Sequence, residues 1–373
     1  MHPLERQLRD DPDDWDAWRV FGDWLTERGD PRGPLVGLEH RLRTEPMPAA
    51  VRAPLVGELQ QRHLEVQNAW LAQQGRLSGV RLAWRAGFVL GVELWTWWGG
   101  ADELGFLEAL PADPAGALFQ RLRLKSHCGL TGFRTLAESP ALTAVRELVL
   151  SEVGMDASMY DGVPGRHGLD LFVRSPHLQQ LRHLDVSRNS LDPSSRAGVT
   201  SSSGTPPVTG DYTDDKGALL ATLADLEVLN VGHCDLGDDQ VGSLVSGALS
   251  PIALDLTANG ITEVGARLLA GSHRLARLKT LILRDNPLDR AGIDKIVSSR
   301  RLSALERLDL SFTLGGGGRP AAPGTADPIA RVLAAAPALA GLKELDLRGN
   351  GLSDEGLAVL TGSDTLRDCL VLR

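Results

Sequence analysis

The chain has 373 residues, 42% of them hydrophobic, which is enough for one long repetitive domain and a small additional module. Its formal net charge of −9 argues against a protein that binds nucleic-acid phosphates, because such proteins usually carry a basic surface. The three cysteines, Cys128, Cys234 and Cys369, are far apart and form no C-x-x-C pair, which excludes a disulfide framework and a cysteine-based zinc site.

The N-terminal sequence, MHPLERQLRDD, is charged and lacks the apolar segment of a signal peptide. The sequence contains no run of about 18 apolar residues, so it predicts no transmembrane helix. We therefore expect a cytoplasmic protein whose cysteines are reduced and whose partner is neither a membrane nor a nucleic acid.

Residues 3–45 predict helices. Asp11 and Pro12 have the order of an N-cap and a first helical residue. Gly29 should end this helix, residues 30–33 should form a turn, and a further helix is expected from about Leu35 to Leu42. The apolar residues at helical spacing, which should share one buried face, are Trp15, Trp18, Val20, Phe21, Trp24 and Leu25.

The stretch PDDWDAWRVFGDWLTERGDPRG resembles a small bacterial module, the repeat-companion domain. The residues that match its D-W-L-x-E-x-G-D-P-R-G core are Asp23, Trp24, Leu25, Glu27, Gly29, Asp30, Pro31, Arg32 and Gly33. The resemblance covers about the first 45 residues and implies a bacterial origin and an attached repeat array, but no biochemical role. Pro34 departs from the family pattern, which usually continues with acidic or apolar residues.

Residues 46–98 predict a helix followed by a hairpin. The helix should run from about Pro54 to Gln74, and residues 79–98 alternate around two glycines as a strand or hairpin does. All eight tryptophans precede residue 99. They either cover the open end of a repeat stack or form a partner-binding patch, for which the candidates are Trp95, Trp97 and Trp98.

From residue 119 onward one pattern recurs, L-x-x-L-x-L-x-x-N-x-L. Leu-x-Leu alternates like a short strand with one buried face, and the asparagine amide can serve backbone groups that would otherwise be buried without partners. Looser copies begin at residues 119, 145, 251 and 305. The best copies are LRHLDVSRNSL (181–191), LEVLNVGHCDL (226–236), LKTLILRDNPL (278–288) and LKELDLRGNGL (342–352).

This pattern is the leucine-rich-repeat signature, and stacked copies bury leucines that one copy cannot bury alone. Undisturbed repeats are 25 to 27 residues long, and segments such as Thr262–Ser272 and Ser353–Thr361 predict a capped helix after each strand. This resembles the ribonuclease-inhibitor-like branch and implies an α/β horseshoe with a concave parallel sheet and convex helices. The expected closing strand is Leu366–Leu372.

The predicted division is a helical module at 1–78, a tryptophan-rich cap at 79–118 and leucine-rich repeats at 119–373. Three insertions interrupt the repeats near residues 154–168, 190–216 and 314–327. Each follows a strand, so all three should leave the same rim, either as tolerated loops or as a binding edge. Val153 and Thr313 replace the asparagine before two of them, which predicts a relaxed turn there. Cys234 also occupies the asparagine position, which predicts a buried structural thiol.

No catalytic motif is found. Gly315–Gly318 is followed by Arg-Pro and cannot form a phosphate loop, and the sequence contains neither H-E-x-x-H nor G-x-S-x-G. His183 is expected on the exposed sheet face. Asp23, Glu27 and Asp30 are interpreted as solvated pairs and turn residues. We expect no enzyme activity, metal or cofactor, although an active site within the first 100 residues is the remaining alternative.

The remaining candidate site is the outward face of the strands. Its fifth- and seventh-position rows mix small, acidic and arginine side chains, which are either merely solvated or a site for a basic protein segment. The predicted protein-binding residues on this concave face are Asp185, Asn230, Asp255, Arg284, Asp309, Asp346 and Arg348. The sequence thus predicts a protein-interaction scaffold that uses this face, the rim loops or both. The alternative is a regulatory or sensor subunit, in signalling or defence, that controls a separate effector enzyme.

Overall fold

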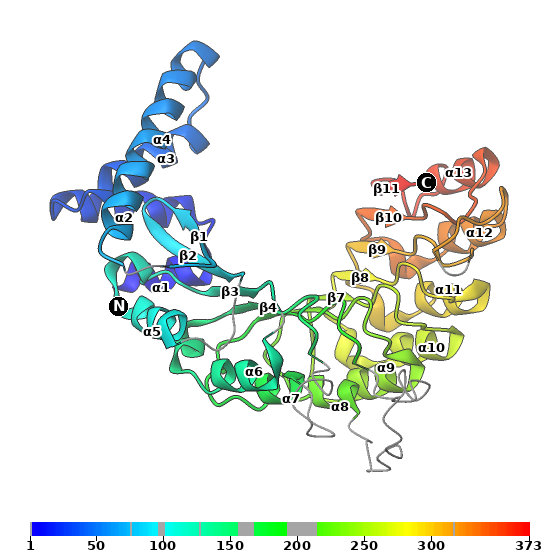
Figure 1. Cartoon of the computed structure of the whole chain (residues 1–373). Helices are drawn as coiled ribbons and strands as arrows, with labels where there is room; N and C mark the ends of the chain where they lie inside the picture. The colour runs from blue at the N-terminus through cyan, green and yellow to red at the C-terminus, as the bar shows by residue number, and fades with distance from the viewer. Residues whose placement is uncertain are drawn as a thin grey trace, which may run out of the picture. The chain divides into compact units, whose positions relative to one another are not determined.

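The computed structural model describes residues 2–74, 77–95, 101–126, 128–155, 168–191, 215–315 and 318–373. They form two compact units. The first comprises Met1–Ser126, Thr135–Glu147 and His177–Gln179, and the second His127–Arg134, Leu148–Pro176 and Gln180–Arg373. The strands of the described residues form one sheet in chain order, from β1 to β11 (Figure 1). The expected α/β leucine-rich-repeat architecture with a helical N-terminal region is thereby confirmed.

Four helices begin the first unit: α1 Pro3–Asp10, α2 Trp15–Glu27, α3 Arg32–Thr44 and α4 Ala49–Leu71. The predicted cap at Asp11 and Pro12 is wrong, because Asp11 ends α1 and Asp14 caps α2 by accepting a 2.9 Å hydrogen bond from the Ala17 amide. Gly29 ends α2 with φ +69°, as expected. Helix α3 starts three residues before the predicted Leu35, since residues 32 and 33 form its first turn.

The core of the first unit lies between α1, α2 and the first hairpin. Trp18 and Phe21 are fully buried, and Phe88 packs against both with ring centroids 5.9 and 5.5 Å away. Trp15 and Trp24 pack against this core from its edge. The prediction for Val20 is wrong, because its side chain is 46% exposed. It points away from the apolar face of the helix that packs on the hairpin.

Helix α4 begins five residues before the predicted Pro54, which lies inside it. Pro48 precedes its first residue, and the helix ends at Leu71. No residue of α4 is buried, whereas α2 buries five of its thirteen. Helix α4 therefore contributes little to the core.

The predicted hairpin is present as β1 Val80–Arg85 and β2 Phe88–Leu94, which pair in antiparallel fashion. Helix α5 Ala101–Ala109 and two short 3-10 helices, η1 Leu110–Ala112 and η2 Pro114–Gly116, lead to β3 Arg121–Leu124. Strand β3 pairs with β2 in parallel. Helix α6 Gly129–Ala137, η3 Pro140–Ala144, β4 Glu147–Val149 and α7 Gly168–Val173 follow.

In the second unit the repeats alternate strands and helices. The strands are β5 His183–Asp185, β6 Val228–Asn230, β7 Ala253–Asp255, β8 Thr280–Ile282, β9 Arg307–Asp309, β10 Glu344–Asp346 and β11 Leu370–Leu372. The helices are α8 Lys216–Leu220, α9 Gly237–Ser246, α10 Glu263–Gly271, α11 Asp289–Val297, α12 Asp327–Ala334 and α13 Asp354–Thr361. Helices α10, α11 and α12 are each followed by a short 3-10 helix: η6 His273–Leu275, η7 Arg300–Leu302 and η8 Pro337–Leu339. Within this unit the helices lie on one side of the strands (Figure 1).

The central leucines of the strands make a continuous interior. Leu184, Leu229, Leu254, Leu281, Leu308 and Leu345 occupy one register from β5 to β10, and each is at most 3% exposed. Each buried leucine contributes about 1.5 to 3 kcal/mol. The predicted shared interior is confirmed.

The predicted helices are also confirmed at their caps. Thr262 caps α10 and Ser353 caps α13, each through its side-chain oxygen. The closing strand is shorter than predicted, since β11 starts at Leu370 and the residues before it form turns.

Candidate protein-binding surface

The fifth-position side chains of the repeats stand in register across the second unit. Asp185, Asn230, Asp255, Ile282, Asp309 and Asp346 are successive strand partners from β5 to β10. Two of the acidic residues are less accessible to a binding partner than the sequence suggests, because Asp309 and Asp346 are only 6% and 2% exposed to solvent.

The polar members of this row cap their own strands. Asp185, Asn230 and Asp255 each accept the amide N–H two residues onward, at 2.9, 3.0 and 2.9 Å. Asp309 and Asp346 do the same, at 2.9 and 3.0 Å. This side-chain turn ends the extended strand conformation. Neither sequence interpretation, solvation or ligand binding, foresaw this structural role.

The exposed members of the predicted site are arginines. Arg348 grips Asp346, with Nε and Nη2 donating to the carboxylate at 3.0 and 2.5 Å. Burial alone would raise the pKa of Asp346, but the hydrogen bonds and charge of Arg348 hold this pKa below its usual value. Arg284 lies over the Phe312 ring, 5.0 Å from its centroid. Both arginines are exposed. They lie at outward positions, on the face of the sheet opposite the helices, which we call the strand face.

A second set of charges lies at the start of these strands and is largely paired. Glu306 accepts from Lys279 and Lys343 at 2.9 and 2.6 Å, and these hydrogen bonds lower its pKa to about 2. Arg307 pairs with Glu344 at 3.3 Å. His183 is exposed on the same face, as expected. The face therefore presents alternating charges of both signs.

From the copy at residue 145 onward, the eighth template position of each described repeat turns through the left-handed region. This positive φ directs the chain away from the sheet, just after the side-chain turns that end the strands whose fifth residue is Asp or Asn. The residues are Glu152, Arg188, His233, Ala258, Asp285, Phe312 and Gly349, with φ between 50° and 73°. Phe312 is the least expected of them, since bulky residues rarely adopt positive φ.

The asparagine at the ninth position hydrogen-bonds buried backbone groups, as predicted, and these include groups of the neighbouring repeat. Asn286 accepts from the amides of Asn259 and Ile261 at 2.9 and 3.0 Å and donates to the Leu256 carbonyl at 2.9 Å. Cys234 is buried at this position, its thiol lies 3.3 Å from the Val186 carbonyl oxygen, and burial raises its pKa to about 12. The predicted structural thiol is confirmed.

The relaxed turn predicted before two insertions is wrong. Asn189 binds the Val153 amide at 3.2 Å and Asn350 binds the Thr313 amide at 2.9 Å, so a neighbouring asparagine holds each turn. The third insertion packs back on the next repeat, where the amides of Ala321 and Gly324 donate to the carbonyls of Gly349 and Gly351. Most of the insertions near 154–168 and 190–216 lies outside the described residues.

The repeat-companion-like motif makes a polar clasp rather than a solvated turn. Arg32 donates to Asp30 at 2.9 and 2.5 Å and to the Pro114 carbonyl at 2.6 Å, and its guanidinium lies 4.3 Å from the centroid of the Phe88 ring. The side chains of Arg32 and Asp30 are 13% and 21% exposed, so the solvated pair expected for Asp30 is wrong. The clasp joins α3 to the hairpin and to η2.

The proposed tryptophan patch is described only at Trp95, which is 40% exposed just after β2. Trp97 and Trp98 lie outside the described residues.

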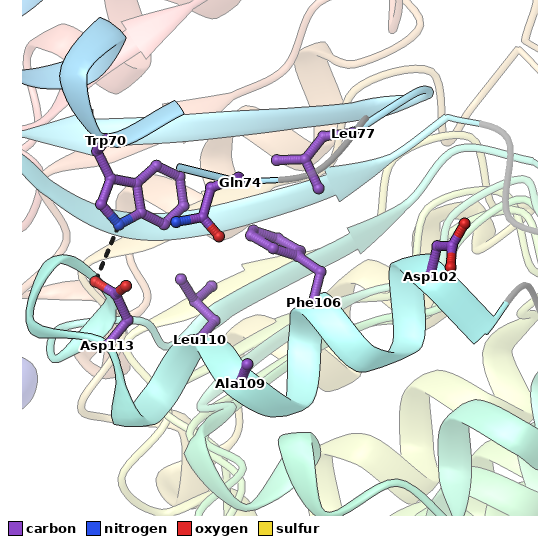
Figure 2. Close-up of a pocket in the computed structure, with 8 residues that line it drawn as sticks. All are labelled: Trp70, Gln74, Leu77, Asp102, Phe106, Ala109, Leu110 and Asp113. Carbon is purple, nitrogen blue, oxygen red and sulfur yellow. Dashed lines mark hydrogen bonds between the residues drawn. The ribbon is translucent and has the colours of Figure 1, made fainter. Parts of the chain in front are cut away.

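A cavity of about 400 Å³ lies between the end of α4 and α5 (Figure 2). Trp70 and Phe106 supply its aromatic walls, and Trp70 donates to Asp113 at 3.0 Å. Asp113 also accepts the Ala115 amide at 2.7 Å, so it caps η2. The other lining residues are Gln74, Leu77, Asp102, Ala109 and Leu110. This lining contains no histidine, cysteine, serine or lysine, and the cavity does not assemble a nucleophile with a base.

The described part of the chain contains no group of three or more histidine, cysteine or carboxylate side chains arranged to hold a metal ion. Within the same residues, every helix is too short or too polar to cross a membrane.

Comparison with known proteins supports the repeat assignment. A family model described as Leucine Rich repeat matches residues 223–240 and 342–360, which contain β6 and β10. The chain thus carries leucine-rich repeats in the second unit. No curated protein matches the chain.

Solved structures with a similar arrangement include an internalin (inlF) from Listeria monocytogenes, with a TM-score of 0.37 and 16% identity over 69% of this chain and 55% of the internalin. A chain of the Rad7 and Elc1 complex in yeast gives a TM-score of 0.40 and 13% identity, covering 72% of this chain and 64% of that one. The chain therefore spans less than two thirds of either solved chain.

Proposed function

We propose that this protein is a non-enzymatic interaction scaffold that binds a protein partner on the strand face of its second unit. The observation that carries the proposal is the strand register itself. It aligns outward side chains across six successive strands while the leucines between them fill the interior. Such an extended surface of mixed charge suits recognition of another protein.

The structure changes which residues we propose for contact. Asp309 and Asp346 are buried strand caps, so Arg284 and Arg348 and the exposed third-position residues His183 and Arg307 are the better candidates. We retain the division at residues 78 and 118, the ribonuclease-inhibitor-like branch, the repeat-companion assignment and a bacterial, cytoplasmic setting as parts of this proposal. They are supported by the sequence patterns alone.

The test begins with affinity purification of the full chain from its source and identification of bound proteins by mass spectrometry. Isothermal titration then compares the wild type with Ala253→Arg/Arg284→Glu, which places a long side chain and a reversed charge on the strand face. We expect partner affinity to fall on the order of tenfold or more.

The matched control is Val264→Arg/Arg267→Glu on the helix side, where Val264 is 44% exposed. It carries the same two kinds of change and should leave partner affinity within about twofold of the wild type. If the control loses binding and the strand-face variant keeps it, the proposed surface is wrong. Recovery of one stoichiometric enzyme would instead favour the regulatory alternative.

A further inference from the structure

The strand face of the first unit carries a small grid of side chains. Arg81 of β1, Glu93 of β2 and Arg123 of β3 are partners across the sheet. One row away, Ala83, Gly91 and Arg121 are partners in the same way. Trp95 and Lys125 follow at the ends of β2 and β3. Because alternate residues of a strand share one face, these side chains point to the same side.

Trp95 lies between two cations. The Arg81 guanidinium is 4.1 Å and the Lys125 ammonium 5.9 Å from the centroid of its ring. The indole N–H donates to Glu93 at 3.3 Å, which fixes the ring against the sheet. An exposed, oriented tryptophan with cations on both sides is a surface that favours aromatic or aliphatic contact together with negative charge.

The local charge is opposite in sign to that of the whole chain. Arg121 pairs with Glu147 of β4 at 2.6 Å and Arg123 with Glu93 at 3.7 Å, so each of these two carboxylates is matched by one arginine. Arg81 and Lys125 have no carboxylate within ion-pair distance among the described residues. The grid therefore has two cations in excess on a chain whose net charge is −9.

Gly91, at the centre of the grid, is buried, because the Cβ atoms of Arg121 and Ala83 lie only 3.2 and 3.4 Å from where its own Cβ would be. Ala83 and Arg121 are exposed on either side of it. A bound segment would therefore contact Ala83 and the arginines, and not the backbone of Gly91.

We propose that this face, formed by the exposed residues Arg81, Ala83, Trp95, Arg121 and Lys125, binds an acidic, extended segment of a partner protein. Carboxylates of the segment pair with Arg81 and Lys125, and one of its apolar side chains packs on Trp95. This rests on the proposed scaffold function but places a separate contact in the first unit.

A protein segment fits this face better than a nucleic acid does. Glu93 lies inside the grid and Glu147 of β4 pairs with Arg121 beside it, so a backbone with a phosphate on every residue would meet both carboxylates. A protein segment can instead place one or two carboxylates on Arg81 and Lys125. An excess of two cations is also small compared with the basic surface that phosphate binding requires, and the net charge of −9 opposes the approach of a polyanion.

The test measures fluorescence anisotropy of a labelled peptide in which glutamates alternate with valine and leucine, using the full chain. A peptide with lysines in place of the glutamates and a single-stranded oligothymidylate are the comparison probes. We expect the acidic peptide to bind, with affinity that falls as salt is added. Arg81→Glu/Lys125→Glu should weaken it on the order of tenfold or more, and Trp95→Ala by roughly three- to tenfold.

The matched control is Arg267→Glu/Lys295→Glu, which changes the net charge equally on exposed helix residues of the second unit. It should leave peptide affinity within about twofold, and circular dichroism should show every variant folded. The proposal fails if this control weakens binding as much as Arg81→Glu/Lys125→Glu does, if the lysine peptide binds as well, or if the oligothymidylate binds more tightly through the same residues.

The same variants separate this inference from the scaffold function. If Arg81→Glu/Lys125→Glu keeps the purified partner and Ala253→Arg/Arg284→Glu loses it, the scaffold stands and the second contact does not exist. Loss of the partner by the first variant alone would place recognition in the first unit and reject the strand face of the second.

Discussion

At the scale of single residues, the left-handed turn at the eighth template position sets the shape of each repeat. Six of the seven residues that take this turn are not glycine, and the amide of each of these six donates a backbone hydrogen bond to the next repeat, such as the Ala258 amide to the Arg284 carbonyl at 2.9 Å. An L-residue in this region costs roughly 1 to 2 kcal/mol relative to its normal conformation. The stack of repeats outweighs that cost because the same turn satisfies backbone groups on both sides.

This position gives opposite predictions in two repeats. Gly349→Ala should destabilise the protein by about 2 kcal/mol or more, because φ is +73° and the new Cβ would lie 2.4 Å from the Phe312 ring. Ala258→Gly should be neutral or stabilising by up to about 1 kcal/mol. Glycine removes the backbone strain of an L-residue at φ +50°, and this gain equals or exceeds the entropy that the more flexible glycine loses on folding. Urea denaturation followed by circular dichroism measures both. Equal losses in the two variants would show that the turn is not the cause.

The sequence could predict which side chains lie inside the repeats but not what the outward ones do. The leucine and asparagine positions follow from spacing, and their burial and hydrogen bonds agree. The sequence predicts Asp309 and Asp346 as part of a binding surface, because position alone shows only that they point away from the core. Their capping role depends on the backbone turning at residues 311 and 348, which no periodicity reveals.

At the scale of elements, the first unit depends on a few polar contacts between helices and hairpin. Gly87, in the tight turn of the hairpin with φ +80°, leaves room for Arg32, since a Cβ there would lie 2.7 Å from the Arg32 Cγ. Gly33 is likewise required, because a Cβ would lie 2.6 Å from the Thr26 amide nitrogen. The motif that resembles the repeat-companion domain is therefore explained by close packing of α2, α3 and the hairpin.

Replacing Arg32 tests this clasp. Arg32→Lys keeps the charge but loses the forked contact with Asp30 and the planar contact with Phe88, so we expect a loss of about 2 kcal/mol in the free energy of unfolding. Tryptophan fluorescence in urea reports it. Arg41→Lys is the matched control on the same helix, where an exposed arginine pairs with the exposed Glu45 at 3.4 Å, and should change stability by less than about 0.5 kcal/mol. If Arg32 contributed only its charge, Arg32→Lys and Arg41→Lys would change the free energy of unfolding equally.

The helix starts show why boundaries are harder to predict than helices. Asp11, Asp13 and Asp14 are all acceptable caps, and Pro12 suits a first helical turn, so local preference favours Asp11. The structure uses Asp14 because Trp18 must reach the core, where its indole N–H donates to the Pro12 carbonyl at 2.8 Å. Tertiary packing thus decides between caps of similar strength.

At the scale of the whole molecule, the tryptophans report on one region only. All eight precede residue 99 and therefore belong to the first unit, whereas the second unit has none. In a stack of repeats each repeat contacts its neighbours, so the effect of a local change weakens with distance along the stack. Fluorescence and circular dichroism can therefore distinguish where the chain loses stability, because backbone dichroism reports on both units.

Leu281→Ala tests whether the two units lose stability separately, because tryptophan fluorescence reports on the first unit and circular dichroism on both. Leu281 is fully buried at the centre of β8, and its truncation should cost about 2 to 5 kcal/mol. We expect the midpoint of the circular dichroism transition in urea to fall clearly and the midpoint of tryptophan fluorescence to fall much less. The reciprocal change is Phe88→Leu in the core of the first unit, which should shift the fluorescence midpoint more. If Leu281→Ala moved both midpoints equally, the whole chain would unfold as one cooperative body and the repeats would not act through their neighbours alone.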